Sequence, residues 1–306
     1  MGQLRVGEKY RVGKRIGKGS FGEIREGKHL QTGQKVAVKL ELRQSECVLL
    51  PLEARLSRLF QGGAGFPSVY WYGEEGKYKA LVIDLLGPSL ADLLTRCGGQ
   101  FSLGTVLKIA DQALSRLEYM HSRNFLHRDL KPANFVVGRG DQAEVIHLID
   151  FGLAKQFRSD GQHIPYREGK SMVGTSRYAS LSAHLGVQQG RKDDLESLGY
   201  LLIYFLNGKL PWQQLKGSGD LDELIRNKKA ATSVSRLCRG LPQQFAVYMN
   251  YCKALGFEEA PNYSYLKRIF KNLYLSSSLV NRREFDWEPT EEQKPERGKK
   301  RRATFG

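Results

Sequence analysis

HRDLKPANF, residues 127–135, is the most specific stretch of this 306-residue chain. Its Asp129 can accept a hydrogen bond from a hydroxyl group and take the proton as that hydroxyl attacks a phosphoryl group. Lys131 can neutralise charge on the transferring group, and Asn134 can give an oxygen to Mg²⁺. Downstream, IDFG (149–152) provides Asp150 as a second metal ligand. Incidental acids in surface loops are the alternative, but they do not explain this spacing, which predicts a phosphoryl-transfer site.

Upstream, IGKGSFGEI (16–24) carries three glycines at GxGxxG spacing. Glycines let backbone amides approach phosphate oxygens closely. A dinucleotide site shares this spacing but needs a helix after the glycines, and here two further strands are predicted. The context favours a hairpin folded over a nucleotide. The residues predicted to bind it are Ile16, Gly17, Lys18, Gly19, Ser20, Phe21, Gly22, Glu23 and Ile24.

A lysine ends the apolar strand VAVK (36–39), where its ammonium can hold α- and β-phosphates. Lys39 alone would be read as a solvated side chain, so a carboxylate partner on the following helix is needed. Glu53 lies in that predicted helix, LPLEARLSRLF (50–60), while Glu41 and Glu46 are less well placed alternatives. We predict a Lys39–Glu53 pair.

The order glycine loop, lysine, helix glutamate, HRD loop and DFG resembles that of eukaryotic protein kinases. The lysine in HRDLK indicates Ser or Thr as the acceptor. The resemblance implies ATP and Mg²⁺ as cofactors and an adenine pocket with apolar walls, although each wall residue taken singly reads as ordinary core. The pocket residues are Ile16, Ile24, Ala37, Val136 and Ile149 as walls, Ile83 at the back, and the backbone of Asp84 and Leu86 at the adenine edge.

The resemblance narrows over LLGPSLADLL (85–94), IDFGLAKQF (149–157), HIPYREGK (163–170), GTSRYASLSAH (174–184) and RKDDLESLGY (191–200). Together these stretches are similar to the casein kinase I family, from about residue 8 to residue 287. That family has Ser-Ile-Asn in place of the usual Ala-Pro-Glu, and Ser180-Leu181-Ser182 stands there in this chain. The resemblance gives Asp194 a structural role as a buried carboxylate that braces the catalytic loop.

The resemblance to the casein kinase I family implies that the Ser or Thr acceptor in a substrate follows acidic or already phosphorylated residues. Arg177, with Lys170 and Arg167 in the same segment, is the candidate for reading the upstream phosphate, because a guanidinium holds phosphate bidentately. The alternative is an ordinary surface salt bridge of Arg177.

Three positions depart from the family pattern. LPWQQLKGSGDLDELIRNKK (210–229) has Gly, Asp and Glu where the family has a basic run. A second anion site is therefore in doubt, although Lys216 and the Lys228-Lys229 pair remain. Ala133 replaces an aspartate and Ser182 an asparagine, and neither change removes a predicted catalytic group.

The expected fold is α+β, with two lobes. Glycine-punctuated strands predict a β-rich lobe over residues 1–86, and longer helical patterns predict a helical lobe over 87–282. Those patterns cover 103–121, 193–208, 242–256 and 263–275; the 193–208 segment is apolar on most faces, which is typical of a buried central helix. Residues 283–306 form a polar, basic tail.

The whole chain has 48 Lys+Arg against 32 Asp+Glu, a net charge of +16. Residues from Arg282 onward carry only +2 of this, so the folded part should attract acidic or phosphorylated protein partners. The alternative is a general charge that keeps the protein in solution. The four scattered cysteines favour reduced thiols in a cytoplasmic or nuclear protein. No membrane span or specific nucleic-acid motif is expected, and we expect a monomer. The rival interpretation is a catalytically weak scaffold with a kinase fold, which the presence of Lys39, Asp129 and Asp150 disfavours.

Overall fold

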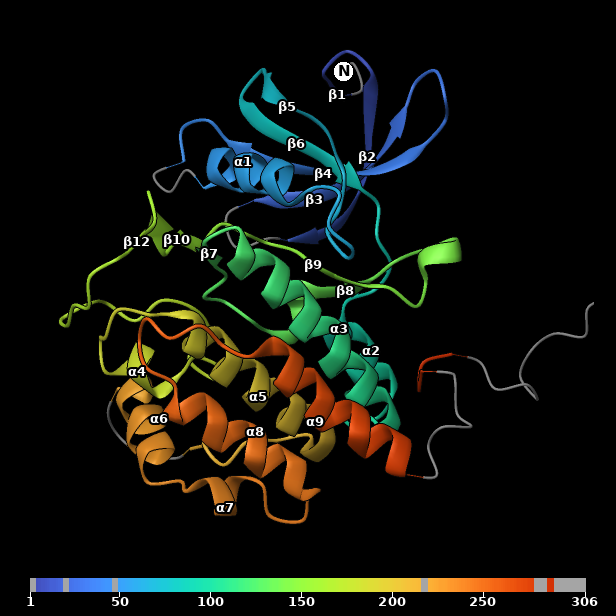
Figure 1. The fold of residues 1–306 in the computed structure, drawn as a ribbon. Coiled ribbons are helices and arrows are strands. Elements are labelled where there is room, and N and C mark those ends of the chain that lie inside the picture. Colours follow the sequence, from blue (N-terminus) through green and yellow to red (C-terminus); the bar gives the residue numbers. More distant parts are fainter. Residues whose placement is uncertain (1–3, 19–21, 46–48, 216–219, 278–284, 289–306) are drawn as a thin grey trace, which may run out of the picture.

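The computed structural model describes residues 4–18, 22–45, 49–215, 220–277 and 285–288. Its N-terminal part is a six-stranded antiparallel sheet in the order β1-β2-β3-β4-β6-β5 (Figure 1). The strands are β1 (Arg5–Val6), β2 (Tyr10–Lys18), β3 (Glu23–His29), β4 (Lys35–Leu42), β5 (Val69–Glu75) and β6 (Tyr78–Asp84).

The two faces of this sheet bury different apolar clusters, because alternate side chains of a strand point to opposite faces. Val36, Val38 and Leu40 of β4 pack with residues of β1 and β2 on one face. On the other face, helix α1 (Leu50–Phe60) contributes Leu50 and Ala54 to a cluster with the β6 strand. Lys39 alternates with Val38 and Leu40, so it belongs to the α1 face.

The remainder of the chain is mainly helical and lies below the sheet in Figure 1. Its helices are α2 (Leu90–Arg96), α3 (Leu103–Ser122), α4 (Leu181–His184), α5 (Arg191–Asn207), α6 (Leu221–Ala230), α7 (Val234–Leu237), α8 (Gln243–Ala254) and α9 (Tyr263–Ser276). Between them run the short helices η1 (Pro132–Asn134) and η2 (Gly140–Gln142), with the strands β7 (Phe125–Leu126), β8 (Phe135–Val137), β9 (Ile146–Leu148), β10 (Lys155–Gln156), β11 (Arg158–Ser159) and β12 (Gln162–His163).

The expected change from a β-rich to a helical region is confirmed. All five helices predicted by apolar periodicity are present, with ends within two residues of those expected. Helix α5 is buried along most of its length and ends at Gly208, whose φ of 68° is the left-handed conformation that favours glycine at a helix end. No helix in the described ranges is long and apolar enough to cross a membrane.

Part of the predicted tail packs against the helical region. Phe285 is buried in the core, and its ring stacks on that of Trp287. The Asp286 carboxylate accepts hydrogen bonds of 2.6 Å from the amide and hydroxyl of Ser102 at the start of α3. Of residues 283–306, only 285–288 belong to the described part of the chain.

Candidate active site

The loop that carries Asp129 is held from below by helix α5. The Asp194 carboxylate accepts the backbone amides of His127 and Arg128, each at 2.8 Å. It also bonds the His121 ring at 2.9 Å, and Asp194, His121 and His127 are all nearly or fully excluded from solvent. Burial would raise the pKa of Asp194, but the hydrogen bond and charge of His121 outweigh it and lower the pKa. A buried carboxylate therefore fixes the loop backbone, in the position that the sequence resemblance implied for Asp194.

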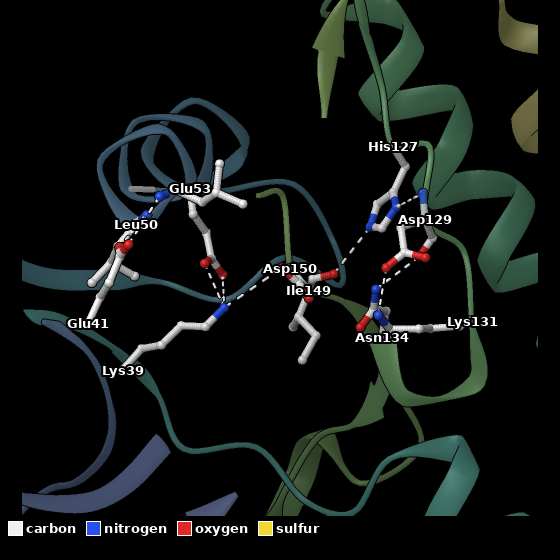
Figure 2. Close-up of polar contacts among 11 residues, drawn as sticks. Lys39, Glu41, Leu50, Glu53, His127, Asp129, Lys131, Asn134, Ile149 and Asp150 are labelled. Carbon is white, nitrogen blue, oxygen red and sulfur yellow. Dashed lines mark hydrogen bonds and ion pairs between the residues drawn. The ribbon is translucent and has the colours of Figure 1, made fainter. Parts of the chain in front are cut away.

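Three groups bond the carboxylate or carbonyl of Asp129, and Figure 2 shows two of them, Lys131 and Asn134. The Lys131 ammonium donates to Oδ2 at 2.6 Å, and the Thr175 hydroxyl donates to Oδ1 at 2.7 Å. The Asn134 amide nitrogen donates to the Asp129 carbonyl at 2.9 Å. Both carboxylate oxygens are thereby oriented, and Asn134 keeps its own side-chain oxygen available.

Lys39 and Glu53 meet across the α1 face of the sheet (Figure 2). The Lys39 ammonium lies 2.6 Å from both carboxylate oxygens of Glu53 and 3.8 Å from Asp150. Burial alone would lower the pKa of Lys39, but the charges of Glu53 and Asp150 outweigh it and raise the pKa. The lysine is therefore held as a cation beside Asp150.

Glu41, one of the two alternatives to Glu53, has a different partner. Its buried carboxylate accepts the amides of Leu49 at 3.2 Å and Leu50 at 2.8 Å, at the start of α1. Leu49 offers no side-chain cap of its own, so the carboxylate from β4 satisfies amides that a helix end leaves unbonded. This tie between β4 and α1 was not predicted from the sequence. The other alternative, Glu46, lies outside the described residues.

The donor set suits a hard divalent cation that is shared with phosphate. Burial would raise the pKa of Asp150, but the charges of Lys39, His127 and Lys131 outweigh it and lower the pKa, so this carboxylate is ionised. With the Asn134 oxygen it offers two hard oxygen ligands. Within the described ranges no group of three or more His, Cys, Asp or Glu side chains could hold a metal. One carboxylate completed by phosphate oxygens and water is how Mg²⁺ is usually bound beside nucleotides.

Unusual backbone geometry marks the same loops. Arg128 and Asp150 both have φ of 69°, in the left-handed region that costs energy for residues other than glycine. The ring of His127 connects the two loops, because its Nε2 bonds the Ile149 carbonyl at 3.2 Å and its Nδ1 accepts the Asp129 amide at 3.2 Å.

The glycine-rich stretch forms the predicted hairpin, with β2 and β3 paired from Tyr10↔His29 to Lys18↔Glu23. Among the residues that the structure describes, a Cβ at Gly17 would approach only Ile24, at 3.8 Å, which is an ordinary van der Waals contact. At Gly22 a Cβ would lie 2.0 Å from the Leu40 carbonyl, so close packing on β4 requires glycine there. The Glu23 carboxylate bonds Arg25 at 2.9 Å. Gly19, Ser20 and Phe21 lie outside the described residues.

The predicted adenine walls come from strands that border the junction of the two regions. Ala37 and Ile83 are register partners in β4 and β6, and Val136 lies in β8. The amide of Asp84 donates to Ser68 and its carboxylate accepts from Ser68 and Tyr70. Because its amide and carboxylate are already paired, the group of Asp84 that is left to bond adenine is its carbonyl oxygen. The other predicted wall and edge residues are Ile16, Ile24, Ile149 and Leu86.

The predicted phosphate-reading cations fall into two groups, the first around a hollow and the second around the charge of Lys155. Arg177 lines a hollow of about 330 Å³ together with Lys131, Tyr178 and Tyr204. Lys170 and Arg167 belong to a second group, with two residues that the sequence prediction missed, Arg128 and Lys155. Burial, followed by the positive charges of the other three, lowers the pKa of Lys155. Their sequence positions, 128 to 170, gave no signal of this cluster.

Among the cations that were left for a second anion site, Lys229 points into the protein. Lys229 is 2 % exposed and its ammonium donates to two backbone carbonyls. At the start of the same helix, Asp222 accepts a hydrogen bond from Ser176 at 2.5 Å. Lys216 lies outside the described residues. Lys229 is thus unavailable to a surface anion, which strengthens the doubt raised by the acidic 217–223 loop of the sequence.

A family model described as "Protein kinase domain" matches residues 10–250. The match covers the glycine hairpin, the Lys39–Glu53 pair, the HRD loop and the DFG stretch. Together with the β-rich first region and the helical second region, it confirms the two-lobed fold expected from the sequence.

Proposed function

The chain belongs to the protein kinase family, and from that premise we propose that it is a Ser/Thr kinase of the casein kinase I type. The family implies phosphoryl transfer from ATP with a divalent metal to protein substrates. The proposal adds Mg²⁺ as the metal, Ser or Thr as the acceptor, and acidic or phosphate-primed sequences as the preferred substrates.

The observation that carries the proposal is the setting of Asp129. One carboxylate oxygen is bonded by Lys131 and the other by Thr175, at 2.6 and 2.7 Å. A carboxylate oriented in this way can accept the hydrogen bond of a substrate hydroxyl and its proton during transfer. Lys131 then lies within reach of the oxygen that gains charge.

Lys39 and Glu53 position the donor. MgATP supplies the γ-phosphoryl group, with Asp150 and Asn134 as the residues that would hold the metal. The Lys39 cation, held 2.6 Å from Glu53, is preorganised to bond phosphate oxygens. All these residues come from different elements of the fold, so their convergence supports a working site in preference to a scaffold.

The positive charge of the chain supports a preference for anionic substrates. The chain without its last 25 residues carries a net +14. Two groups of cations each include a residue of the Asp129 loop: Lys131 with Arg177, and Arg128 with Lys155, Arg167 and Lys170. Clustered arginine and lysine side chains favour phosphate, which accepts several charge-assisted hydrogen bonds at once.

A peptide assay tests this function. Serine peptides with a phosphate, an aspartate or an alanine three residues before the acceptor are compared under Mg²⁺ and ATP. We expect the highest kcat/KM with phosphate, a lower value with aspartate and the lowest with alanine. Equal values for the three peptides would contradict the proposed preference, and no phosphorylation of any peptide would contradict the proposed activity.

Arg177→Ala tests which cation reads the phosphate. We expect KM for the phosphate-primed peptide to rise by about tenfold, since a charge-assisted hydrogen bond is lost, and KM for the aspartate peptide to rise much less. The control is Arg239→Ala, an exposed arginine distant in sequence from the segment. Equal losses on both peptides would exclude Arg177 as the phosphate-reading residue.

A further inference from the structure

The stretch GTSRYASLSAH (174–184) follows the DFG loop and contains Arg177, but it lacks the Ala-Pro-Glu that usually closes this segment. Its first residue, Gly174, has φ of 106°, and a Cβ there would lie 2.3 Å from the Arg128 carbonyl. The next residue, Thr175, bonds Asp129. The segment therefore begins in contact with the predicted catalytic loop, and whatever holds the segment also holds Thr175.

Lys229, near the end of α6, reaches into this segment. Its ammonium donates to the Ser176 carbonyl at 2.7 Å and to the Ala179 carbonyl at 2.5 Å. It also lies 3.1 Å from Nε2 of His184, in the short helix α4. One side chain therefore binds the beginning, the middle and the end of the stretch between residues 176 and 184.

Neighbouring side chains hold the same residues. Asp222, in the first turn of α6, accepts the Ser176 hydroxyl at 2.5 Å, so α6 grips Ser176 through two groups. The Trp212 indole donates to the Arg177 carbonyl at 2.7 Å, and the Lys229 ammonium lies 5.1 Å from the centre of that indole ring. The backbone on both sides of the Arg177 side chain is therefore fixed by buried donors.

The far end of the segment is tied to α5. The Ser180 hydroxyl donates to Asp193 at 2.6 Å, and the Leu181 amide donates to Glu196 at 3.2 Å. Ser180-Leu181-Ser182 brings no carboxylate of its own, so in this chain the helices supply the charged groups and the segment supplies hydroxyl, amide and carbonyl partners.

Removing the Lys229 amine would leave two carbonyls without their donor in a buried place. Lys229 is 2 % exposed, and an unsatisfied buried polar group costs more than the net value of the bond that it loses. The segment could recover solvent for these carbonyls only by moving away from α6. Such a movement would carry Arg177 and Thr175 with it.

We propose that Lys229 is a positioning residue for phosphoryl transfer, which holds the 176–184 stretch against α6 in the arrangement that presents Arg177 to the acceptor peptide and Thr175 to Asp129. The presentation of Arg177 to an acceptor peptide rests on the proposed function. The holding of the 176–184 stretch against α6 does not depend on that function.

The kinetic test compares Lys229→Met with Lys253→Met, which removes an exposed lysine of helix α8. For Lys229→Met we expect KM for the primed peptide to rise by about tenfold, while KM for ATP stays within about twofold, because the ATP-binding elements do not touch Lys229. Lys229→Arg should recover part of the loss, and Lys253→Met should resemble the wild type. A KM for the peptide that is unchanged by Lys229→Met, or equal rises in both KM values, would overturn the proposal.

Hydrogen exchange of the free protein provides a readout that needs no activity. Amides of residues 174–186 should exchange at least about tenfold faster in Lys229→Met, and those of α3 and α5 should be unchanged. If Lys229→Met does not fold, both measurements are made on Lys229→Gln, which keeps an amide donor but is shorter and neutral. Unchanged exchange in the segment would overturn the proposal. An inactive wild type with faster exchange in the variant would contradict the proposed function and leave the anchoring role supported.

Discussion

Lys229 is an ionisable side chain that is almost completely buried. Burial lowers its pKa from the ordinary 10.5 to about 7, although the charges of Glu196 and Asp222 act in the opposite direction. The ammonium also lies 3.1 Å from Nε2 of His184 and 5.2 Å from the centre of the Tyr200 ring. Burial followed by the Lys229 charge lowers the pKa of His184 as well. The folded chain therefore releases the Lys229 proton at a lower pH than the unfolded chain does.

This difference predicts how stability depends on pH. Between pH 7 and 10.5 the unfolded chain binds more protons at Lys229, so the free energy of unfolding should rise with pH, by up to about 1.4 kcal/mol per pH unit from this group. Below pH 7 this contribution is lost. Urea unfolding at pH 7 and pH 9 measures it.

In Lys229→Met this rise should disappear, whereas Lys253→Met should keep it. Parallel stability curves for the wild type and Lys229→Met across this range would show that Lys229 titrates normally, and would contradict the burial that the anchoring role requires.

At the residue scale, sequence patterns identified groups whose chemistry is carried by a local motif. Lys39, Asp129, Asn134 and Asp150 belong to short stretches with characteristic spacing. The structure brings Lys39 of β4 to within 3.8 Å of Asp150, and His127 links the Asp150 and Asp129 loops. Glu41, Thr175 and Lys229 have no such motif. Their roles come from contacts between elements up to 53 residues apart in the chain, which a single sequence does not encode as a pattern. Only the tertiary fold makes these contacts visible.

At the scale of elements, helix α1 is the link between the sheet and Lys39. Its first turn is tied to β4 through Glu41, and its last residue, Phe60, packs its ring 5.0 Å from that of Phe151 in the DFG stretch. The helix is therefore fixed at both ends, and Glu53 lies between them. Displacing either end would separate Glu53 from Lys39.

Glu41→Ala should loosen the first of these ends. We expect the free energy of unfolding to fall by about 1–2 kcal/mol, as when a helix cap is removed, and KM for ATP to rise several-fold because Lys39 loses its fixed partner. Glu74→Ala, which removes an exposed carboxylate paired with Arg43 at 3.0 Å, is the control and should change stability by less than about 0.5 kcal/mol. An unchanged KM for ATP in Glu41→Ala would show that α1 keeps its position without this tie.

Helices α2 and α6 show what apolar periodicity could not reveal. Helix α2 spans only seven residues, too few for a repeated stripe, although Ser89 and Asp92 form a capping box that marks its start. Half of the residues of helix α6 are charged, and the helix buries little beyond Ile225 and Lys229. The five longer helices each bury an apolar face, which is the signal that periodicity detects. Short or polar helices that depend on caps and tertiary contacts escape it.

At the scale of the whole molecule, the site lies where the sheet region meets the helical region, and both regions contribute its charged side chains. Lys39 and Glu53 come from the sheet region, and Asp129, Lys131 and Asn134 from the helical region, with Asp150 between them (Figure 2). No single element carries enough of these groups to act alone. Activity is therefore expected to depend on the closed arrangement of both regions.

The most direct test of this account is phosphate transfer from γ-labelled ATP with Mg²⁺ to a phosphate-primed serine peptide, measured for the wild type and Asp129→Asn. The matched control is Asp141→Asn, an exposed aspartate in the same region. We predict transfer by the wild type and by the control, and a kcat at least about a hundredfold lower in Asp129→Asn, which keeps the shape but loses the proton acceptor. Transfer that is undiminished in Asp129→Asn, or absent from the wild type, would contradict the account.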